Sequence, residues 1–83
     1  MNTETEVSKL FEQVEVSHDP DWLQYSANLE KVRLSVFRTS GGFFSAVATS
    51  HASGWRHTKR IDAAYKDSAL IEAYQWAWDR GWA

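Results

Sequence analysis

The sequence contains no cysteine and a single proline among its 83 residues. Without cysteine the chain forms neither disulfides nor thiolate metal sites, so its stability must come from packing. It also lacks a long apolar run, because no segment approaches the roughly 18 residues that a membrane-spanning helix needs. Its first six residues carry Glu4 and Glu6 where a signal peptide would carry bases. We therefore expect one small domain over residues 1–83 that acts in the cytoplasm.

The motifs that usually carry catalysis or hold a cofactor are missing as well. There is no glycine-rich phosphate loop, no nucleophile elbow and no carboxylate pair at helical spacing on an apolar surface. His18, His51 and His57 do not have the spacing of a zinc site. A chain this short closes one core and has little left for a deep cleft. We expect a non-catalytic binding module without a metal or cofactor.

Hydrophobic periodicity predicts an α+β domain of order α-β-β-β-α. A helix over residues 4–15 is predicted from one apolar stripe, formed by Val7, Leu10, Phe11 and Val14. Alternation of apolar and polar residues predicts strands over 29–38, 43–50 and 55–61. A broad apolar face centred on Tyr74 predicts a closing helix over 67–80. We expect a three-stranded antiparallel sheet with both helices packed on one face.

The first hairpin has two candidate registers, which place opposite residues in the core. A loop of two or four residues puts Phe43 and Val47 beside Val36, whereas a loop of three puts Phe44 there, with Ala46 and Ala48. The turn itself is expected at residues 39–42, and a second turn at 51–54.

The ends of the closing helix also carry signals. Asp67 or Ser68 is expected to cap its first turn, and Gly81 to end it. After Pro20, Trp22 and Leu23 either form a short helical turn or belong to a loop.

Charge is divided by segment. Residues 1–30 hold seven acids and one base, residues 31–60 six bases and no acid, and residues 61–83 four acids and two bases. Either the bases only solvate outward strand positions, or they form a basic sheet face with an aromatic ring that binds nucleic acid. The residues of this alternative site are Lys31, Arg33, Phe37, Arg56 and Arg60.

The closing helix predicts a different surface. Trp76 falls on its polar side, where an indole exposes apolar area that a monomer usually hides. Either Arg80 or the N-terminal segment covers this indole, or it anchors a partner protein or a second copy of the chain in a homodimer. The predicted protein-binding residues are Trp76, Glu72, Asp79, Glu4, Glu12 and Glu15.

Two resemblances follow from these elements. The segment over residues 68–78 resembles the closing helix of small phage accessory proteins, including anti-CRISPR proteins. The predicted β-hairpin before it is also similar to theirs. That resemblance implies an inhibitor that occludes a host nucleic-acid-handling complex through an acidic surface, in the host cytoplasm. In element order alone the chain also resembles a double-stranded-RNA-binding domain. Residues 39–42 stand where that family has its histidine-bearing loop but contain no histidine. Residues 65–68 stand at its lysine cluster and contain one lysine, Lys66.

Overall fold

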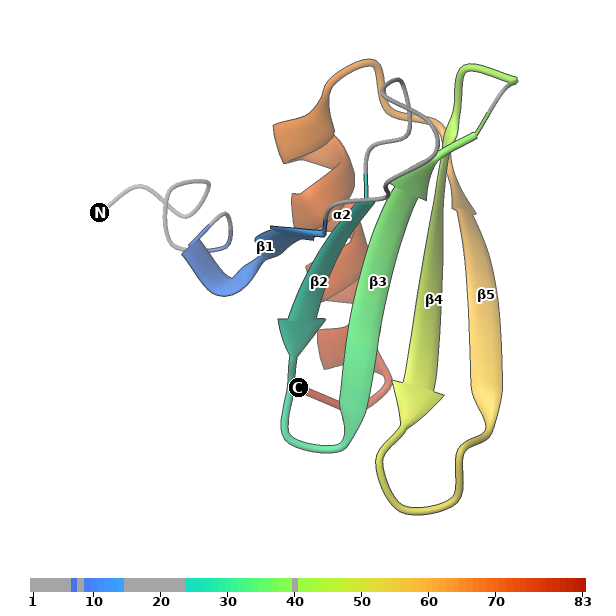
Figure 1. Ribbon diagram of the computed structural model, residues 1–83. Helices are drawn as coiled ribbons and strands as arrows, with labels where there is room; N and C mark the ends of the chain where they lie inside the picture. Colours follow the sequence, from blue (N-terminus) through green and yellow to red (C-terminus); the bar gives the residue numbers. More distant parts are fainter. Residues whose placement is uncertain (1–6, 8, 15–23, 40) are drawn as a thin grey trace.

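The structure, a computed structural model, describes residues 7, 9–14, 24–39 and 41–83 (Figure 1). These residues form an antiparallel sheet of five strands followed by a helix. The elements are β1 (Glu12–Val14), β2 (Gln24–Asn28), β3 (Val32–Arg38), β4 (Phe44–Ser50), β5 (Arg56–Ile61) and α2 (Lys66–Asp79). Each strand pairs with its neighbours in sequence, so the sheet is a simple meander.

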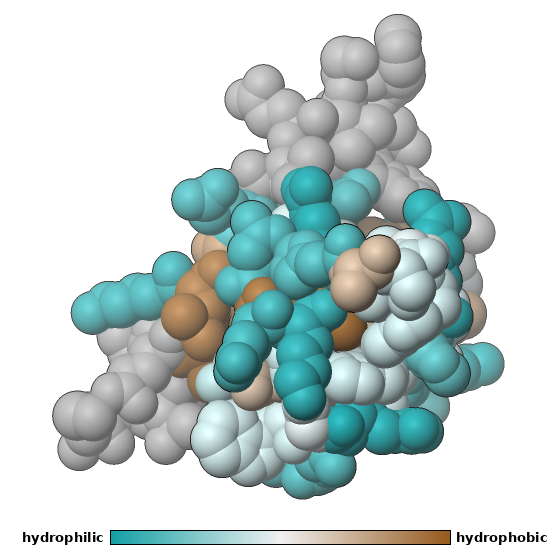
Figure 2. Space-filling model, turned by 90° about the horizontal axis from the view of Figure 1, so that it is seen from below, coloured by the Kyte–Doolittle hydropathy of each residue, from teal (hydrophilic) through white to brown (hydrophobic). Residues whose placement is uncertain are grey.

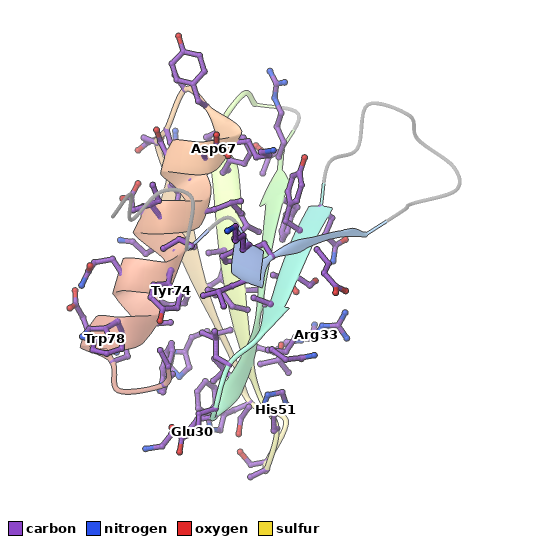
Figure 3. All side chains as sticks on the ribbon, turned by 90° about the vertical axis from the view of Figure 1, so that its left-hand side faces the viewer. Glu30, Arg33, His51, Asp67, Tyr74 and Trp78 are labelled. Carbon is purple, nitrogen blue, oxygen red and sulfur yellow. The ribbon has the colours of Figure 1, made fainter. Side chains whose placement is uncertain are left out.

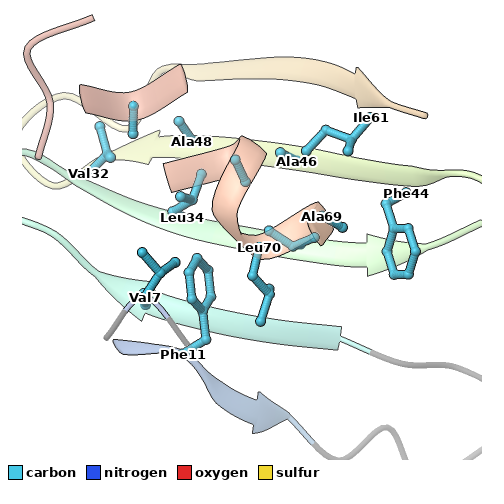
Figure 4. Packing of buried hydrophobic residues seen from close by; sticks show 14 residues of the cluster. Val7, Phe11, Val32, Leu34, Phe44, Ala46, Ala48, Ile61, Ala69 and Leu70 are labelled. Atoms are coloured by element: carbon cyan, nitrogen blue, oxygen red, sulfur yellow. The ribbon is translucent and has the colours of Figure 1, made fainter. Parts of the chain in front are cut away.

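Helix α2 covers one face of the sheet and packs mainly on β3, β4 and β5 (Figure 1). The hydrophobic core lies between these two layers (Figure 4). Its buried residues are Val7, Phe11, Ala27, Val32, Leu34, Val36, Phe44, Ala46, Ala48, Ile61, Ala69, Leu70, Ala73 and Ala77. Because side chains alternate along a strand, the residues between these core positions on β2 to β5 face away from α2.

The hairpin register follows from the loop between β3 and β4. Arg38 pairs with Phe44 and Val36 with Ala46, so five residues lie between the strands. This odd number has the parity of a three-residue loop, and it places Phe44 and Ala46 in the core. Gly42 allows the turn, since its φ of 83° lies in the left-handed region.

The α+β class, the antiparallel sheet and the closing helix are confirmed, but the predicted order α-β-β-β-α is wrong. The stripe predicted as a helix over 4–15 is helical at Val7 and Leu10, and then becomes β1 at Glu12. Pairing with β2 stabilises this strand, and such tertiary pairing overrides a local helical pattern. The rest of that predicted helix, and the turn at Trp22, lie outside the described residues.

Helix α2 is rotated from its predicted orientation. Its buried residues are Ala69, Leu70, Ala73 and Ala77, whereas Trp78 is 61% exposed and Tyr74 only half-buried. Small side chains let the helix approach the sheet closely, so alanines occupy the contact and the larger rings lie outside it.

The two ends of α2 differ in how they are capped. Tyr65 is the N-cap and makes no side-chain bond to the helix, so the cap predicted at Asp67 or Ser68 is absent. Gly81, with a φ of 76°, ends the helix as predicted. Trp82 N donates to Ala77 O at 3.0 Å and Gly81 N to Trp78 O at 3.0 Å, which is a Schellman motif. Among the described residues, no helix has the length and apolarity to cross a membrane.

Candidate nucleic-acid interface

The sheet face turned away from α2, here called the open face, carries arginines in register. One cross-strand row runs through Asn28, Arg33, Thr49 and Arg56. A second row on the same face runs through Gln24, Phe37, Ser45 and Arg60. The row between them contains Glu12, Ser26, Ser35, Val47 and Thr58. The structure therefore brings four of the five residues of the alternative site to one face.

Arg33 and Arg56 form the more open part of this face. Both side chains are exposed, and Thr49 of the intervening strand lies between them. Their backbones are therefore about 10 Å apart, or two strand spacings. Figure 3, which views the sheet from its side, shows Arg33 pointing away from the layer that holds Tyr74 and Trp78. The two guanidinium groups thus present positive charge to solvent on the side opposite the helix.

Arg60 is held by two neighbours. Its Nε donates to Asp62 Oδ1 at 3.0 Å, and its guanidinium carbon lies 4.0 Å from the ring centroid of Phe43. Both charged side chains remain more than half exposed, so solvent screens the ion pair. The stacking fixes Phe43 beside the arginine row. The sequence does not decide whether Phe43 or Phe44 lies on the open face. The loop parity does, because it buries Phe44 in the core.

Phe37 shares the row of Arg60 and is half-buried. Lys31 lies in the turn between β2 and β3, at the end of the open face. Its backbone N donates to Trp82 O at 3.1 Å, and its O accepts from His51 N at 3.1 Å. Lys31 therefore belongs to the end of the molecule where three chain segments meet.

The predicted protein-binding residues do not form one surface. Glu72 and Asp79 are exposed on α2, and Asp79 accepts a hydrogen bond from Gln75 Nε2 at 3.0 Å. Glu12 instead belongs to the middle row of the open face, on β1. Glu4 and Glu15 lie outside the described residues.

Trp76 is not the exposed anchor that the helical wheel predicts. It is half-buried, and its ring packs edge-on against Trp82 at 5.2 Å between centroids. The cover predicted from Arg80 is wrong, since Arg80 lies over Trp82 at 5.8 Å from that ring. Most of the N-terminal segment, the other predicted cover, lies outside the described residues. Trp82 in turn contacts Trp55 at 5.1 Å and His57 at 5.5 Å. Sequence reasoning missed this cluster because only the sheet register and the Schellman turn bring its members together.

An apolar groove lies between α2 and Val7. Val7, Ile71, Tyr74, Gln75 and Trp78 line its volume of about 260 Å³. The rings of Tyr74 and Trp78 are 6.3 Å apart, and Trp78 is the more exposed. The large apolar surface of the helix is thus centred on Trp78, two positions from the predicted Trp76.

Within the part of the chain that the structure describes, no group of three His, Asp or Glu side chains is placed to hold a metal ion. No family model, curated protein or solved structure matches the chain.

Proposed function

We propose that this protein is a non-catalytic module that binds single-stranded nucleic acid on its open sheet face. The observation that carries the proposal is the cross-strand register, which gathers Arg33, Arg56 and Arg60 on the face opposite the helix. On that face the described carboxylates are Glu12, at the β1 edge, and Asp62, which is paired with Arg60. Phosphate groups favour such a cluster of guanidinium donors.

A single strand suits this face better than a duplex. Unpaired bases can stack on aromatic side chains while the backbone follows a basic groove, and sheet-based modules use this combination. Phe43 stands beside Arg60, and Phe37 lies in the same row of the sheet. Both aromatic rings therefore lie next to Arg60 or in its row of the sheet.

Charge separation supports the proposal despite the net charge of −2. The exposed acids of α2, namely Asp67, Glu72 and Asp79, belong to the opposite layer. A local field, more than the overall charge, steers a polyanion to its site. The proposed place of action is the cytoplasm, as the sequence predicts.

The test is the salt dependence of binding to a labelled oligothymidylate of about 15 nucleotides, a length that covers one small binding fold. Binding is followed by fluorescence anisotropy. In Arg33→Gln/Arg56→Gln we expect the slope of log affinity against log salt to fall by about 2, since each lost phosphate contact removes about one. Affinity should fall at least tenfold at low salt, by roughly the same reasoning.

The matched control is Arg38→Gln/Lys66→Gln, which removes the same charge from positions outside the open face. Arg38 lies in the row of Phe44 and Lys66 on α2. The control should lose little affinity and keep the wild-type salt slope. Equal losses in the two variants, or no binding by the wild type, would show that the open face is not the site.

A second candidate function rests on the groove beside Trp78. In this alternative the protein is the inhibitor that the sequence predicts, and it binds another protein through α2. The exposed Trp78 would insert an apolar anchor, and the acids Glu72 and Asp79 would attract a basic partner segment. A host complex that handles nucleic acid offers such a segment in its phosphate-binding groove.

Binding to an immobilised basic nucleic-acid-binding protein separates the two functions. Trp78→Ala and Glu72→Lys/Asp79→Lys should each weaken this contact at least tenfold and leave oligothymidylate binding unchanged, as expected for a central interface anchor. The circular dichroism spectrum serves as the control for folding. If Arg33→Gln/Arg56→Gln weakens the contact as strongly, the partner meets the sheet and the helix is not involved.

A further inference from the structure

A cavity of about 470 Å³ lies at one end of the molecule. It lies where the β2–β3 turn, the β4–β5 turn and the segment after α2 meet. Figure 3 shows Glu30 and His51 together at this end. Its lining residues are Glu30, Lys31, Ser50, His51, Ala52, Trp55, Arg80, Gly81 and Trp82. In Figure 2, which looks onto this end, hydrophilic surface lies beside paler surface of intermediate hydropathy.

Backbone hydrogen bonds hold the walls of this cavity in place. Lys31 N donates to Trp82 O at 3.1 Å, His51 N to Lys31 O at 3.1 Å, and Ser50 N to Trp55 O at 2.9 Å. Each bond joins two of the lining residues. The cavity is therefore formed before any ligand arrives, and a preformed site costs less ordering on binding.

The turn that presents Trp55 is fixed as well. Ser50 Oγ accepts from the backbone N of Ala52 and of Ser53, each at 3.3 Å. Gly54, with a φ of 74°, lets the chain reverse, and its N donates to Ser50 O at 3.1 Å. Trp55 contacts His57 edge-on at 4.8 Å and Trp82 at 5.1 Å, yet it remains 37% exposed. The indole of Trp55 therefore lies at the opening of the cavity and exposes apolar surface there.

The polar lining is suited to a nucleotide. Lys31 and Arg80 supply two cations, and both are exposed at the rim. His51 Nε2 is 3.1 Å from Leu29 O, and because a carbonyl only accepts, Nε2 carries the proton. Glu30 offers a carboxylate for an exocyclic amino group. Aromatic, cationic and accepting groups meet in a space that holds one base with its phosphate.

We propose that this cavity binds one purine nucleotide of the strand that lies on the open face, with the base against Trp55 and Trp82 and the phosphate against Lys31 and Arg80. This inference rests on the proposed function, because it treats the cavity as an extension of the open face. Lys31 lies at the end of the open face, two residues from Arg33, whereas Trp55 contacts His57 and Trp82 on the helix side of the sheet. A strand that crosses the arginine row therefore reaches the cavity by turning round the end of the sheet at Lys31.

The test is a titration with adenosine monophosphate, followed by NMR of the tryptophan indole N–H signals. The signals of Trp55 and Trp82 should shift and that of Trp78, on the other side of α2, should not. Trp55→Ala should lower the affinity for the nucleotide about tenfold, as the loss of one stacked base does. Trp78→Ala is the matched control and should bind like the wild type. Lys31→Gln should weaken the monophosphate more than adenosine.

The outcomes separate this site from the proposed function. If the Trp55 and Trp82 signals stay still, or if Trp55→Ala binds like the wild type, the cavity is not a nucleotide site. Oligothymidylate binding that depends on Arg33 and Arg56 would then still support the open face. If the nucleotide shifts both signals but no oligothymidylate binds, the cavity is supported as a nucleotide site and the open face is overturned.

Discussion

At the scale of single residues, the end of α2 determines where two tryptophans lie. Gly81 takes a left-handed backbone, and the next residue, Trp82, folds back onto Trp76 and Trp55. The bond from Lys31 N to Trp82 O then ties this segment to the β2–β3 turn. One glycine thus orients both the aromatic cluster and one wall of the cavity.

Gly81→Ala should destabilise the protein by about 1 kcal/mol, because a Cβ raises the cost of the left-handed conformation. A Cβ at this position meets no atom within 4 Å, so the loss is one of backbone conformation and not of steric fit. Urea unfolding followed by tryptophan fluorescence measures it. Gly81→Asn should lose less, since asparagine tolerates this conformation better. Equal losses in both variants would contradict this account.

The sequence predicted some single residues and not others. Gly81 was predicted because a glycine after a helical pattern has one common role. Trp76 was misplaced because a helical wheel shows only the helix, whereas the covering ring comes from Trp82, beyond its end. Glu12 was assigned to a helix face because β1 has no pattern of its own in three residues.

At the scale of elements, the contact between α2 and the sheet is made by small side chains. Ala69, Ala73 and Ala77 share the core with Ala46 and Ala48 of β4, and all five are fully buried. In Figure 4 the labelled Ala69 lies over the sheet that carries Ala46 and Ala48. This close approach leaves the larger rings of α2 on its flanks and outer side, and the groove forms between this helix and Val7.

Ala73→Leu should destabilise the protein by about 1 to 3 kcal/mol, the usual cost of adding volume to a packed core. Ala73 is 0% exposed, so the added methyl groups have no way out between helix and sheet. Chemical unfolding gives the value. Gln75→Leu, at an exposed position of the same helix, is the control and should change stability by less than about 0.5 kcal/mol. If Ala73→Leu left the free energy of unfolding unchanged, the helix and the sheet would not be in close contact at Ala73.

Element prediction succeeded where a pattern was long. The predicted strands over 29–38, 43–50 and 55–61 contain β3, β4 and β5, and the helix over 67–80 overlaps α2. Strand β2 was missed because Ser26, Ala27 and Asn28 have little strand preference, and pairing with β3 decides their state. The loop parity was also beyond the sequence, although it fixes which phenylalanine enters the core.

At the scale of the whole molecule, charge is divided between two faces. The basic central segment becomes β3, β4 and most of the edge strand β5, and the described acids of the closing segment lie mostly on α2. The sequence predicted this division only in part, because Arg38 and Lys59 pair with the core positions Phe44 and Ala46 and so lie on the helix side. It did not reveal that the arginines of β3 and β5 fall in the same row, which needs the register of β4 between them.

The meander topology has a consequence for how the chain acquires its structure. Every strand pairs with its sequence neighbour, so each pairing closes only a short loop, and the docking of α2 is the step that adds contacts across layers. Domains dominated by such local contacts fold fast, in about the millisecond range or below for mixed α/β topologies. If the β3–β4 hairpin forms early and α2 docks late, Ala73→Leu will act mainly by speeding unfolding, whereas changes in that hairpin will slow folding.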